Sequence, residues 1–316
     1  MRFNILMPAY NAATDIEKAI NSVISQNYED FLLIVVNDGS QDNTEEILNS
    51  FADNEKVKVI NQQNTGIAGA YKKAFEELDG DYIMFLDSDD AMEKNALQEI
   101  SECIEKTNAD IVQFGISYFS ESWEYKRSLI FPEKEIVSNE NILLDYFNGL
   151  NNGTNRPNLG IRAYKSELLN NFIFPPIASL GIDEILNLFG MTKCNKIAFM
   201  PKAYYLCQQR GNSVSRIKPS SKKVSGVLAS YREMEKILLE NHSAFADLLY
   251  LKFIRFYISH LNIIKKLPSY KTDKQDFKRY VKTVKASSRI KLGFKLNLRI
   301  SLLLIFPFLS FVLSKY

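Results

Sequence analysis

Short apolar runs and segments of helical periodicity alternate along the chain from Met1 to Gly115. The apolar runs that predict strands are Phe3–Pro8, Phe31–Asn37, Val57–Asn61, Asp81–Asp87 and Asp110–Gly115. Segments with apolar residues at helical spacing lie between them, at Asp15–Gln26, Thr44–Ala52, Gly66–Leu78 and Glu93–Lys106. Strands separated by single helices predict βαβ units with right-handed crossovers and a mostly parallel sheet flanked by helices. The predicted fold class is therefore α/β.

The pattern is weaker between Tyr118 and Gly160. A hairpin around Trp123, a short helix at Asn139–Phe147 and a mobile Asn- and Gly-rich loop at Asn148–Asn158 are the predicted elements. Later signals predict strands at Ile161–Tyr164, Lys196–Phe199 and Ala203–Gln208, and helices at Asp183–Met191, from Pro219 to Leu267 and from Asp273 to Lys285. The chain thus has an α/β part followed by a helical extension.

Polar or small residues stand at the ends of four predicted strands. These segments are Pro8-Ala9-Tyr10-Asn11, Asn37-Asp38-Gly39-Ser40, Asn64-Thr65-Gly66 and Asp87-Ser88-Asp89-Asp90. In parallel α/β sheets, ligands bind beyond the carboxyl ends of the strands. We therefore expect these segments to share one rim of the sheet and to form a binding site there.

The last of these segments carries three carboxylates in close succession. Such a cluster is unfavourable to bury unless a cation lies among the carboxylates. Oxygen ligands of this kind suit Mg²⁺ or Mn²⁺. The alternative is a turn rich in helix-capping Asp residues before Met92–Lys106.

Charge is distributed unevenly along the chain. From Lys265 onward there are 13 Lys and Arg residues and only two acids, whereas the preceding part has 26 basic and 35 acidic residues. This asymmetry predicts an anionic surface as the partner of the C-terminal region.

Several functional classes are disfavoured by what the chain lacks. The three cysteines have no CxxC spacing, so they are expected to be small core residues and not metal ligands or redox groups. The two histidines form no HExxH motif and are too few to suggest a His-based triad. The segment Met7–Thr14 contains no glycine, which disfavours the phosphate loop of a nucleotidyltransferase and the GxGxxG of a dinucleotide-dependent oxidoreductase. No signal-peptide pattern precedes the first strand, so a cytoplasmic location is expected.

Three segments, Met7–Ala12, Val36–Thr44 and Gly80–Asp90, together resemble family 2 glycosyltransferases. The resemblance covers residues 2–110 closely and a weaker block at 179–216. It implies a GT-A fold with a Rossmann-like sheet, and a metal-dependent enzyme that transfers a hexosyl or N-acetylhexosaminyl group with inversion. The implied donor is a nucleotide sugar, with a UDP-linked one expected, and nucleic acid is not an expected partner.

The resemblance assigns the base-binding side of the donor site to the first two strand ends. Pro8, Ala9 and Tyr10 would border the nucleotide base, and the Asp38 carboxylate would accept a hydrogen bond from it. Turn or helix-capping roles are the alternatives for Asp38. Asn37 stands where many relatives have Asp and is not expected to be a ligand.

The resemblance also divides the roles within the acidic cluster. Asp87 and Ser88 would lie on the ribose side, and Asp89 would bind the metal, with Asp87 as a second metal ligand; Asp90 has no assigned role. At the third strand end, Asn64 and Gly66 open a helix whose N-terminal amides could face phosphate.

A second block, Ser179–Leu188, resembles the segment that carries the general base. By position this base is Asp183, and the adjacent Glu184 is its rival; plain charge compensation at a helix N-terminus is the alternative for both. Arg210 matches a basic position near the leaving diphosphate. In the implied reaction, Asp183 removes a proton from an acceptor hydroxyl, whose oxygen displaces the diphosphate.

The C-terminal segment combines basic and apolar residues. Its apolar run, Ile300–Leu313, is interrupted by a proline and is too short to span a bilayer, so it is expected to lie on an anionic leaflet. Packing on the protein itself or on a second subunit is the alternative. The expected arrangement is a GT-A domain at 1–218, with a nucleotide-sugar half at 1–110 and an acceptor half at 111–218, then a helical extension at 219–285 and a membrane-associating tail at 286–316.

Taken together, these features predict an enzyme of surface polysaccharide synthesis on the inner face of the plasma membrane. Its acceptor would be a glycan or a lipid-linked saccharide, and assembly into a homo-oligomer stays open. The alternative function is a non-catalytic nucleotide-sugar-binding or membrane scaffold that retains the fold.

Overall fold

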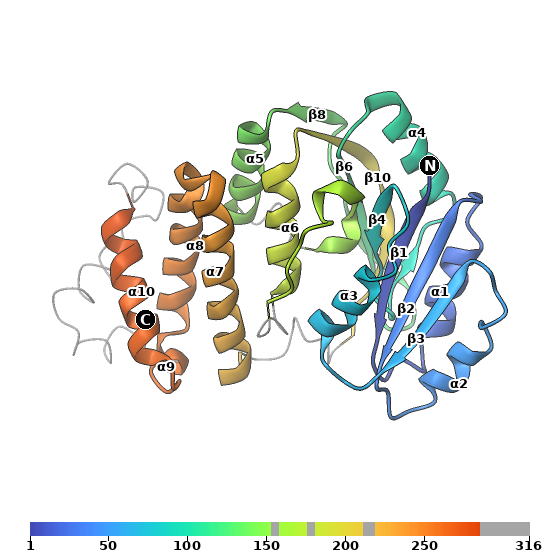
Figure 1. Cartoon of the computed structure of the whole chain (residues 1–316), viewed down its shortest axis with the longest axis horizontal. Coiled ribbons are helices and arrows are strands. Elements are labelled where there is room, and N and C mark those ends of the chain that lie inside the picture. The colour runs from blue at the N-terminus through green and yellow to red at the C-terminus, as the bar shows by residue number, and fades with distance from the viewer. Residues whose placement is uncertain (153–157, 176–180, 211–218, 285–316) are drawn as a thin grey trace. The chain divides into compact units, whose positions relative to one another are not determined.

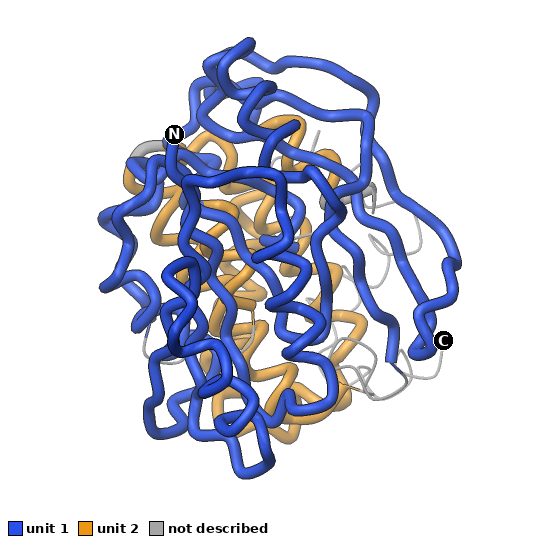
Figure 2. Tube along the Cα trace, turned by 90° about the vertical axis from the view of Figure 1, so that its right-hand side faces the viewer, with its two compact units in different colours: residues 1–142, 157–179, 189–217 blue, residues 143–156, 180–188, 218–316 orange. Residues whose placement is uncertain are grey.

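A computed structural model of the chain describes residues 1–152, 158–175, 181–210 and 219–284 (Figure 1). The chain forms two compact units (Figure 2). The first comprises residues 1–142, 157–179 and 189–217, and the second comprises residues 143–156, 180–188 and 218–316. The segment with Asp183 thus belongs to the same unit as the C-terminal helices. The expected arrangement, which divides the chain at residue 218, instead places this segment in the GT-A domain.

The first unit contains one mixed sheet. Its strands are β1 (Phe3–Ala9), β2 (Phe31–Asp38), β3 (Val57–Gln62), β4 (Tyr82–Phe85), β5 (Ala91–Met92), β6 (Ile111–Phe119), β7 (Tyr125–Leu129), β8 (Lys134–Val137), β9 (Arg162–Lys165) and β10 (Lys196–Gln208). They lie in the order β3-β2-β1-β4-β9-β6-β10-β5, with β7 beside β6 and β8 beside β10.

Strand direction divides the sheet into two halves. The strands β3, β2, β1 and β4 are all parallel, as predicted for the βαβ units that precede Asp110. In the other half, β9 runs antiparallel to both β4 and β6, whereas β6 and β10 are parallel. The predicted α/β class is confirmed, and the insertion of β9 makes the second half of the sheet mixed.

Helices flank both halves of the sheet. Those on the parallel half are α1 (Ile16–Ile24), α2 (Thr44–Asn49) and α3 (Ile67–Phe75), whereas α4 (Ala96–Thr107) packs against β6 and β10. Alternate residues of β1, Phe3 and Ile5 among them, share one core with Ile16 and Ile20 of α1. On α3, which packs against β1 and β2, the ring of Tyr71 meets Phe85 of β4 edge-on at 5.3 Å. The amphipathic pattern of each helix therefore accounts for the face it buries.

The weakly patterned middle of the chain differs from its prediction at one helix. The helix α5 (Asn139–Asn152) includes Asn148–Asn152, which were expected in a mobile loop; residues 153–157 lie outside the described part. The buried side chains of Leu143, Tyr146 and Phe147 give this helix its apolar face despite the surrounding Asn and Gly. The hairpin around Trp123 is confirmed as β6 and β7, and the helix predicted at 183–191 is α6 (Ile182–Lys193).

The second unit contains the C-terminal helices. These are α7 (Ser221–Asn241), α8 (Ala246–Ser259), the short α9 (Leu261–Ile264) and α10 (Tyr270–Thr283). A buried carboxylate on α7, that of Glu235, accepts hydrogen bonds from Tyr250 on α8 (2.8 Å) and Tyr280 on α10 (2.7 Å). Within the described ranges, no helix combines the length and apolar character needed to cross a membrane. The predicted tail at 286–316 lies outside the described residues.

Candidate active site

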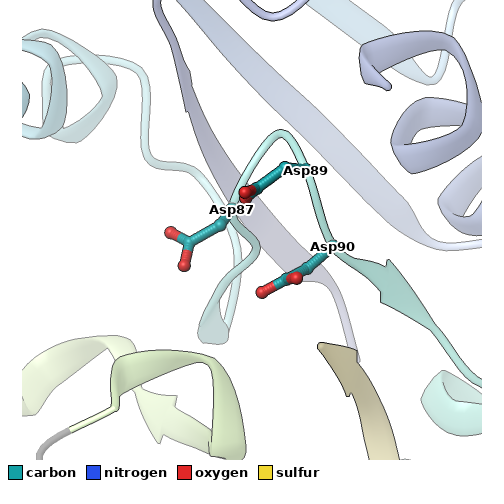
Figure 3. A group of neighbouring side chains, drawn as sticks. All are labelled: Asp87, Asp89 and Asp90. Atoms are coloured by element: carbon teal, nitrogen blue, oxygen red, sulfur yellow. The ribbon is translucent and has the colours of Figure 1, made fainter. Parts of the chain in front are cut away.

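Three carboxylates lie together on the turn that follows β4. The buried strand Tyr82–Phe85 delivers the chain to Asp87, Asp89 and Asp90, whose carboxylate oxygens lie within 4.8 Å of one another (Figure 3). The backbone N–H of Asp90 donates to the carbonyl of Asp87 (3.1 Å), which closes the turn. The sequence predicted this cluster, and the fold brings its three members to one point.

The electrostatics of the turn favour a bound cation. Desolvation, followed by the charge of Asp89, raises the pKa of Asp87 to about 6. Desolvation also raises the pKa values of Asp89 and, strongly, of Asp90. Carboxylates that repel one another in a partly desolvated place take up protons or a cation. The donor set is all oxygen, which fits Mg²⁺ or Mn²⁺.

Asp90 differs from its two neighbours because it is tied to strand β10. Asp90 is buried, and its Oδ1 accepts a hydrogen bond from the backbone N–H of Gln208 (2.7 Å). The Tyr205 hydroxyl accepts the backbone N–H of Asp87 (3.3 Å), and it lies beside the carboxyl groups of Asp87 and Asp90, where it opposes the rise of their pKa values. The carboxylate that had no predicted role therefore joins the turn to β10.

Arg210 places a positive charge beside the carboxylates. Its guanidinium donates to Gln208 Oε1 through Nε (2.9 Å) and through one terminal nitrogen (2.8 Å), and it forms an ion pair with Asp15. Although burial dominates the pKa shift at Asp89, the charge of Arg210 acts in the opposite direction and favours the ionised form. The predicted basic residue is thus close enough to Asp89 to influence its ionisation.

Three residues of this site were not singled out by the sequence. Tyr205 and Gln208 lie on one predicted strand, but period-two alternation does not say which side chain meets the acidic turn. Asp15 has the appearance of a residue near a helix start. Its pairing with Arg210 joins positions far apart in the sequence, which only the tertiary structure brings together.

The end of β1 presents an aromatic ring to solvent. Ala9 is buried and pairs in register with Asn37 of β2, whereas the Tyr10 side chain is 49% exposed. The next residue fixes the loop: Asn11 Oδ1 accepts the backbone N–H of Gln41 (2.8 Å) and the Asn11 N–H donates to Ser40 Oγ (3.0 Å). Pro8, Ala9 and Tyr10 therefore lie at one rim of the sheet, next to the end of β2.

At the end of β2, the Asp38 carboxylate is engaged by the protein itself. Its Oδ1 accepts hydrogen bonds from Gln62 Nε2 (2.7 Å) and from the backbone N–H (2.8 Å) and hydroxyl (3.2 Å) of Thr65. Its Oδ2 accepts the backbone N–H of Gly66 (2.8 Å), and Asn64 Nδ2 donates to the Asp38 carbonyl (2.9 Å). The backbone N–H groups of Thr65 and Gly66, at the end of α3 that was expected to face phosphate, thus donate to Asp38. These bonds match the turn role that was the alternative for Asp38.

The two candidates for the general base lie at the start of α6, in the second unit. Glu184 forms an ion pair with Lys252 of α8 (2.7 Å). The backbone carbonyl of Asp183 accepts a hydrogen bond from Asn187 Nδ2 (2.7 Å). The Glu184 carboxylate is therefore held by a lysine of the same unit.

Comparison with known proteins gives this rim a family context. The model of glycosyl transferase family 2 matches residues 4–173. Glycosyltransferase GlyA of Streptococcus pneumoniae is 27% identical over 225 residues, which are 68% of this chain and 32% of GlyA. The chain therefore spans about a third of the length of that relative.

Solved structures share the fold. TarS of S. aureus in complex with UDP-GlcNAc has a TM-score of 0.67 and 21% identity, covering 91% of this chain and 83% of that one. The mannosyltransferase PcManGT from Pyrobaculum calidifontis, in complex with GDP-Man and Mn²⁺, has a TM-score of 0.53 and 16% identity, covering 99% and 83%. The sheet, its flanking helices and the acidic turn after β4 are those of a GT-A fold, and the chain belongs to glycosyl transferase family 2.

Proposed function

We propose that this protein transfers a hexosyl or N-acetylhexosaminyl group from a nucleoside-diphosphate sugar to a hydroxyl of a glycan or lipid-linked saccharide, with inversion at the anomeric carbon. One observation carries the proposal: the group of three carboxylates at the end of β4, with the Arg210 guanidinium beside it, in a family 2 chain. Phosphate oxygens, a divalent cation and a fixed guanidinium are charges that compensate one another.

We infer that the donor is UDP-linked, because TarS, which holds UDP-GlcNAc, is more similar in fold than PcManGT, which holds GDP-Man. The exposed Tyr10 ring, with Pro8 and Ala9 before it, offers a stacking surface for the base. Among described residues, Asp38 Oδ2 accepts only one hydrogen bond. A carboxylate oxygen has two lone pairs, so Asp38 retains an acceptor site for the base.

The diphosphate is assigned to the acidic turn. Asp87 and Ser88 face the ribose side, and Asp89, with Asp87, would hold Mn²⁺ or Mg²⁺. The bound cation supplies compensation for the charge that develops on the leaving diphosphate. Arg210 adds a permanent positive charge from the protein.

We assign the base role to Asp183, which takes the proton of the acceptor hydroxyl as that oxygen attacks the anomeric carbon. We take the rival Glu184, which forms an ion pair with Lys252 of α8, as a structural residue of the second unit. The attack from the face opposite the diphosphate inverts the anomeric centre.

The proposed location is the inner face of the plasma membrane. Besides the basic and apolar tail, α10 supports this view. Lys271, Lys274, Lys278 and Lys282 follow one another at helical spacing on one side of α10, and none of them forms an ion pair with a described residue. The two acids of α10, Asp273 and Asp276, are instead paired with Arg232. This side of α10 thus carries uncompensated positive charge, which suits anionic lipid headgroups.

The test combines binding and turnover. Purified protein is screened with a panel of nucleotide sugars, with and without Mn²⁺, for a rise in melting temperature and for release of the nucleoside diphosphate. We expect stabilisation by a UDP sugar that depends on Mn²⁺. Metal-dependent binding without turnover on any saccharide acceptor would favour the non-catalytic alternative, and the absence of any binding would overturn the proposal.

A second measurement separates the two acids. Asp183→Asn is expected to abolish transfer while the affinity for UDP changes less than about threefold, because the substitution removes the base and leaves the donor contacts in place. Glu184→Gln is the matched control and should retain turnover. If Glu184→Gln is inactive and Asp183→Asn is active, the base is Glu184.

A further inference from the structure

Tyr205 is a side chain of β10 that reaches the acidic turn. It is 2% exposed, its hydroxyl accepts the backbone N–H of Asp87 (3.3 Å), and it lies beside the carboxyl groups of Asp87 and Asp90. A phenol has one proton to donate, so it serves one of the two carboxylates at a time. This hydroxyl thus stands between the first and the last acid of the turn.

Gly160 makes room for the Tyr205 ring. A Cβ atom on Gly160 would lie 2.0 Å from Cε2 of that ring, so no other residue fits without displacing it. The backbone N–H of Gly160 donates to Asn158 Oδ1 (2.7 Å), and the Asn158 carbonyl accepts from the buried Arg162 guanidinium (3.0 Å). Arg162 is itself fixed by Gln113 Oε1 (2.9 Å). The wall behind the ring is therefore held by β6 and β9.

Asp90 is tied to β10 through its Oδ1. This oxygen accepts the backbone N–H of Gln208 (2.7 Å), and the Tyr205 hydroxyl lies beside the same carboxyl group. An acid held in this way is poorly placed to turn toward a cation. Among the described residues of β10, Tyr205 is the one whose side chain bonds to Asp87, at its backbone N–H, and no side chain of this strand bonds to Asp89.

We propose that Tyr205, seated against Gly160, is a positioning residue that sets the geometry of the metal site, with Asp90 as its structural partner and not a metal ligand. The inference rests on the proposed function, which assigns the metal to this turn. It adds a dependence of metal affinity on β10, a strand that no sequence motif connected with metal binding.

The test is Mn²⁺ affinity of the full-length protein, measured by electron paramagnetic resonance of free Mn²⁺. Tyr205→Phe keeps the ring and removes the hydroxyl, and we expect the Mn²⁺ dissociation constant to rise about tenfold, the size of one lost hydrogen bond. Gly160→Ala, on a different element, should produce a loss of at least the same size because the added methyl group displaces the ring.

Tyr204→Phe is the matched control. It removes the neighbouring phenol, which donates to Glu99 Oε2 (2.5 Å), and so costs a tyrosine–carboxylate hydrogen bond away from the acidic turn. We expect this variant to lose thermal stability and to keep its Mn²⁺ affinity within about twofold of the wild-type value. Thermal unfolding of each variant confirms that it is folded.

The outcomes separate the two levels of the proposal. If the wild-type protein binds Mn²⁺ and Tyr205→Phe binds it equally well, the positioning role is wrong and the proposed function stands. If Tyr204→Phe weakens Mn²⁺ binding as much as Tyr205→Phe, the effect is general loosening and the positioning role is again wrong. If the wild-type protein binds no Mn²⁺, both the inference and the metal-dependent function are overturned.

Discussion

The Asp38 carboxylate holds the start of α3 through hydrogen bonds to Gln62, Thr65 and Gly66. Hydrogen bonds to an ionised acceptor are stronger than those between neutral groups. The same group therefore has two contributions to make, one to the stability of the fold and one to the proposed recognition of the nucleotide base.

Replacing Asp38 by Asn should reveal the stabilising contribution. We expect the free energy of unfolding to fall by about 2 kcal/mol, because an amide can accept on one side only and leaves a part-buried backbone N–H without its charged partner. Urea unfolding measures this loss. Asp53→Asn, at an exposed position, is the control and should change the free energy of unfolding by less than about 0.5 kcal/mol. Equal stability of the two variants would contradict the stabilising role of the Asp38 hydrogen bonds.

The members of the acidic turn should respond unequally to neutralisation. We expect Asp89→Asn to weaken Mn²⁺ binding by more than about a hundredfold, beyond the usual effect of a residue outside the coordination shell. Asp90→Asn should weaken it by about tenfold, because Asn Oδ1 can still accept the N–H of Gln208 while one negative charge is lost. Isothermal titration with Mn²⁺ gives both values. A greater loss for Asp90→Asn would make Asp90 the ligand.

Among the elements, the strands of the parallel half were more predictable than those of the other half. Each of β1, β2 and β3 is a mainly apolar run closed by turn residues, interrupted once in β1 by Asn4 and once in β3 by Lys58, and its predicted ends agree closely with the structure. The strand β10 was predicted as two pieces because Pro201 interrupts the run. Proline cannot donate to the ladder, and the structure accommodates it where the register with β6 shifts.

The residues of the candidate site also differ in how well the sequence predicts them. Residues at the ends of parallel strands meet because topology requires it, so the grouping of Tyr10, Asp38 and Asp89 at one rim was accessible from the pattern. The contacts of Tyr205 and of Asp15 depend on how β10 approaches the turn. Such contacts are set by side-chain packing between distant segments and leave no periodic signal.

The helices of the second unit share a buried ionic network with a predictable response to acid. Although burial opposes it, hydrogen bonds from Arg279, Tyr280 and Tyr250 hold the pKa of Glu235 below its ordinary value. A carboxyl whose pKa is lower in the folded state stabilises that state above its unfolded pKa of 4.5, and this contribution is lost as the pH falls through the folded value.

Glu235→Gln should therefore lower stability at neutral pH and flatten the loss of stability below about pH 4.5. Thermal unfolding across the acidic and neutral range shows both effects. Glu233→Gln, close by on the same helix and in an ion pair with the exposed Lys236, is the control and should leave the pH profile unchanged. Parallel profiles for Glu235→Gln and the wild-type protein would contradict the role of this network.

At the scale of the whole molecule, the charge asymmetry predicts where the protein meets a membrane. We expect Lys271, Lys278 and Lys282 changed together to Gln to weaken binding to vesicles that contain phosphatidylserine by about 3 kcal/mol at low salt, about 1 kcal/mol for each lysine. Co-sedimentation measures the bound fraction. The matched control, Lys94, Lys106 and Lys126 changed to Gln, should bind as the wild-type protein does.

Removal of residues 286–316 should weaken binding further, because the tail supplies the apolar contribution. If the shortened protein and the α10 variant both bind as the wild-type protein does, the membrane is met by another surface. If neither the wild-type protein nor its variants bind, the peripheral location is wrong.

The membership of residues 180–188 in the helical unit has a practical consequence for where the chain can be cut. Gly181 packs so closely on Ser230 that a Cβ atom would lie 2.3 Å from its hydroxyl oxygen, and Ile182, Ile185 and Leu186 are buried. An expression fragment that stops at residue 218 would lack Ser230, on which Gly181 packs, and Lys252, which pairs with Glu184. We expect it to precipitate or aggregate in light scattering, whereas the full chain stays monodisperse. Any minimal version of this enzyme must therefore keep α7, α8 and α10, although none of them carries a motif of its family.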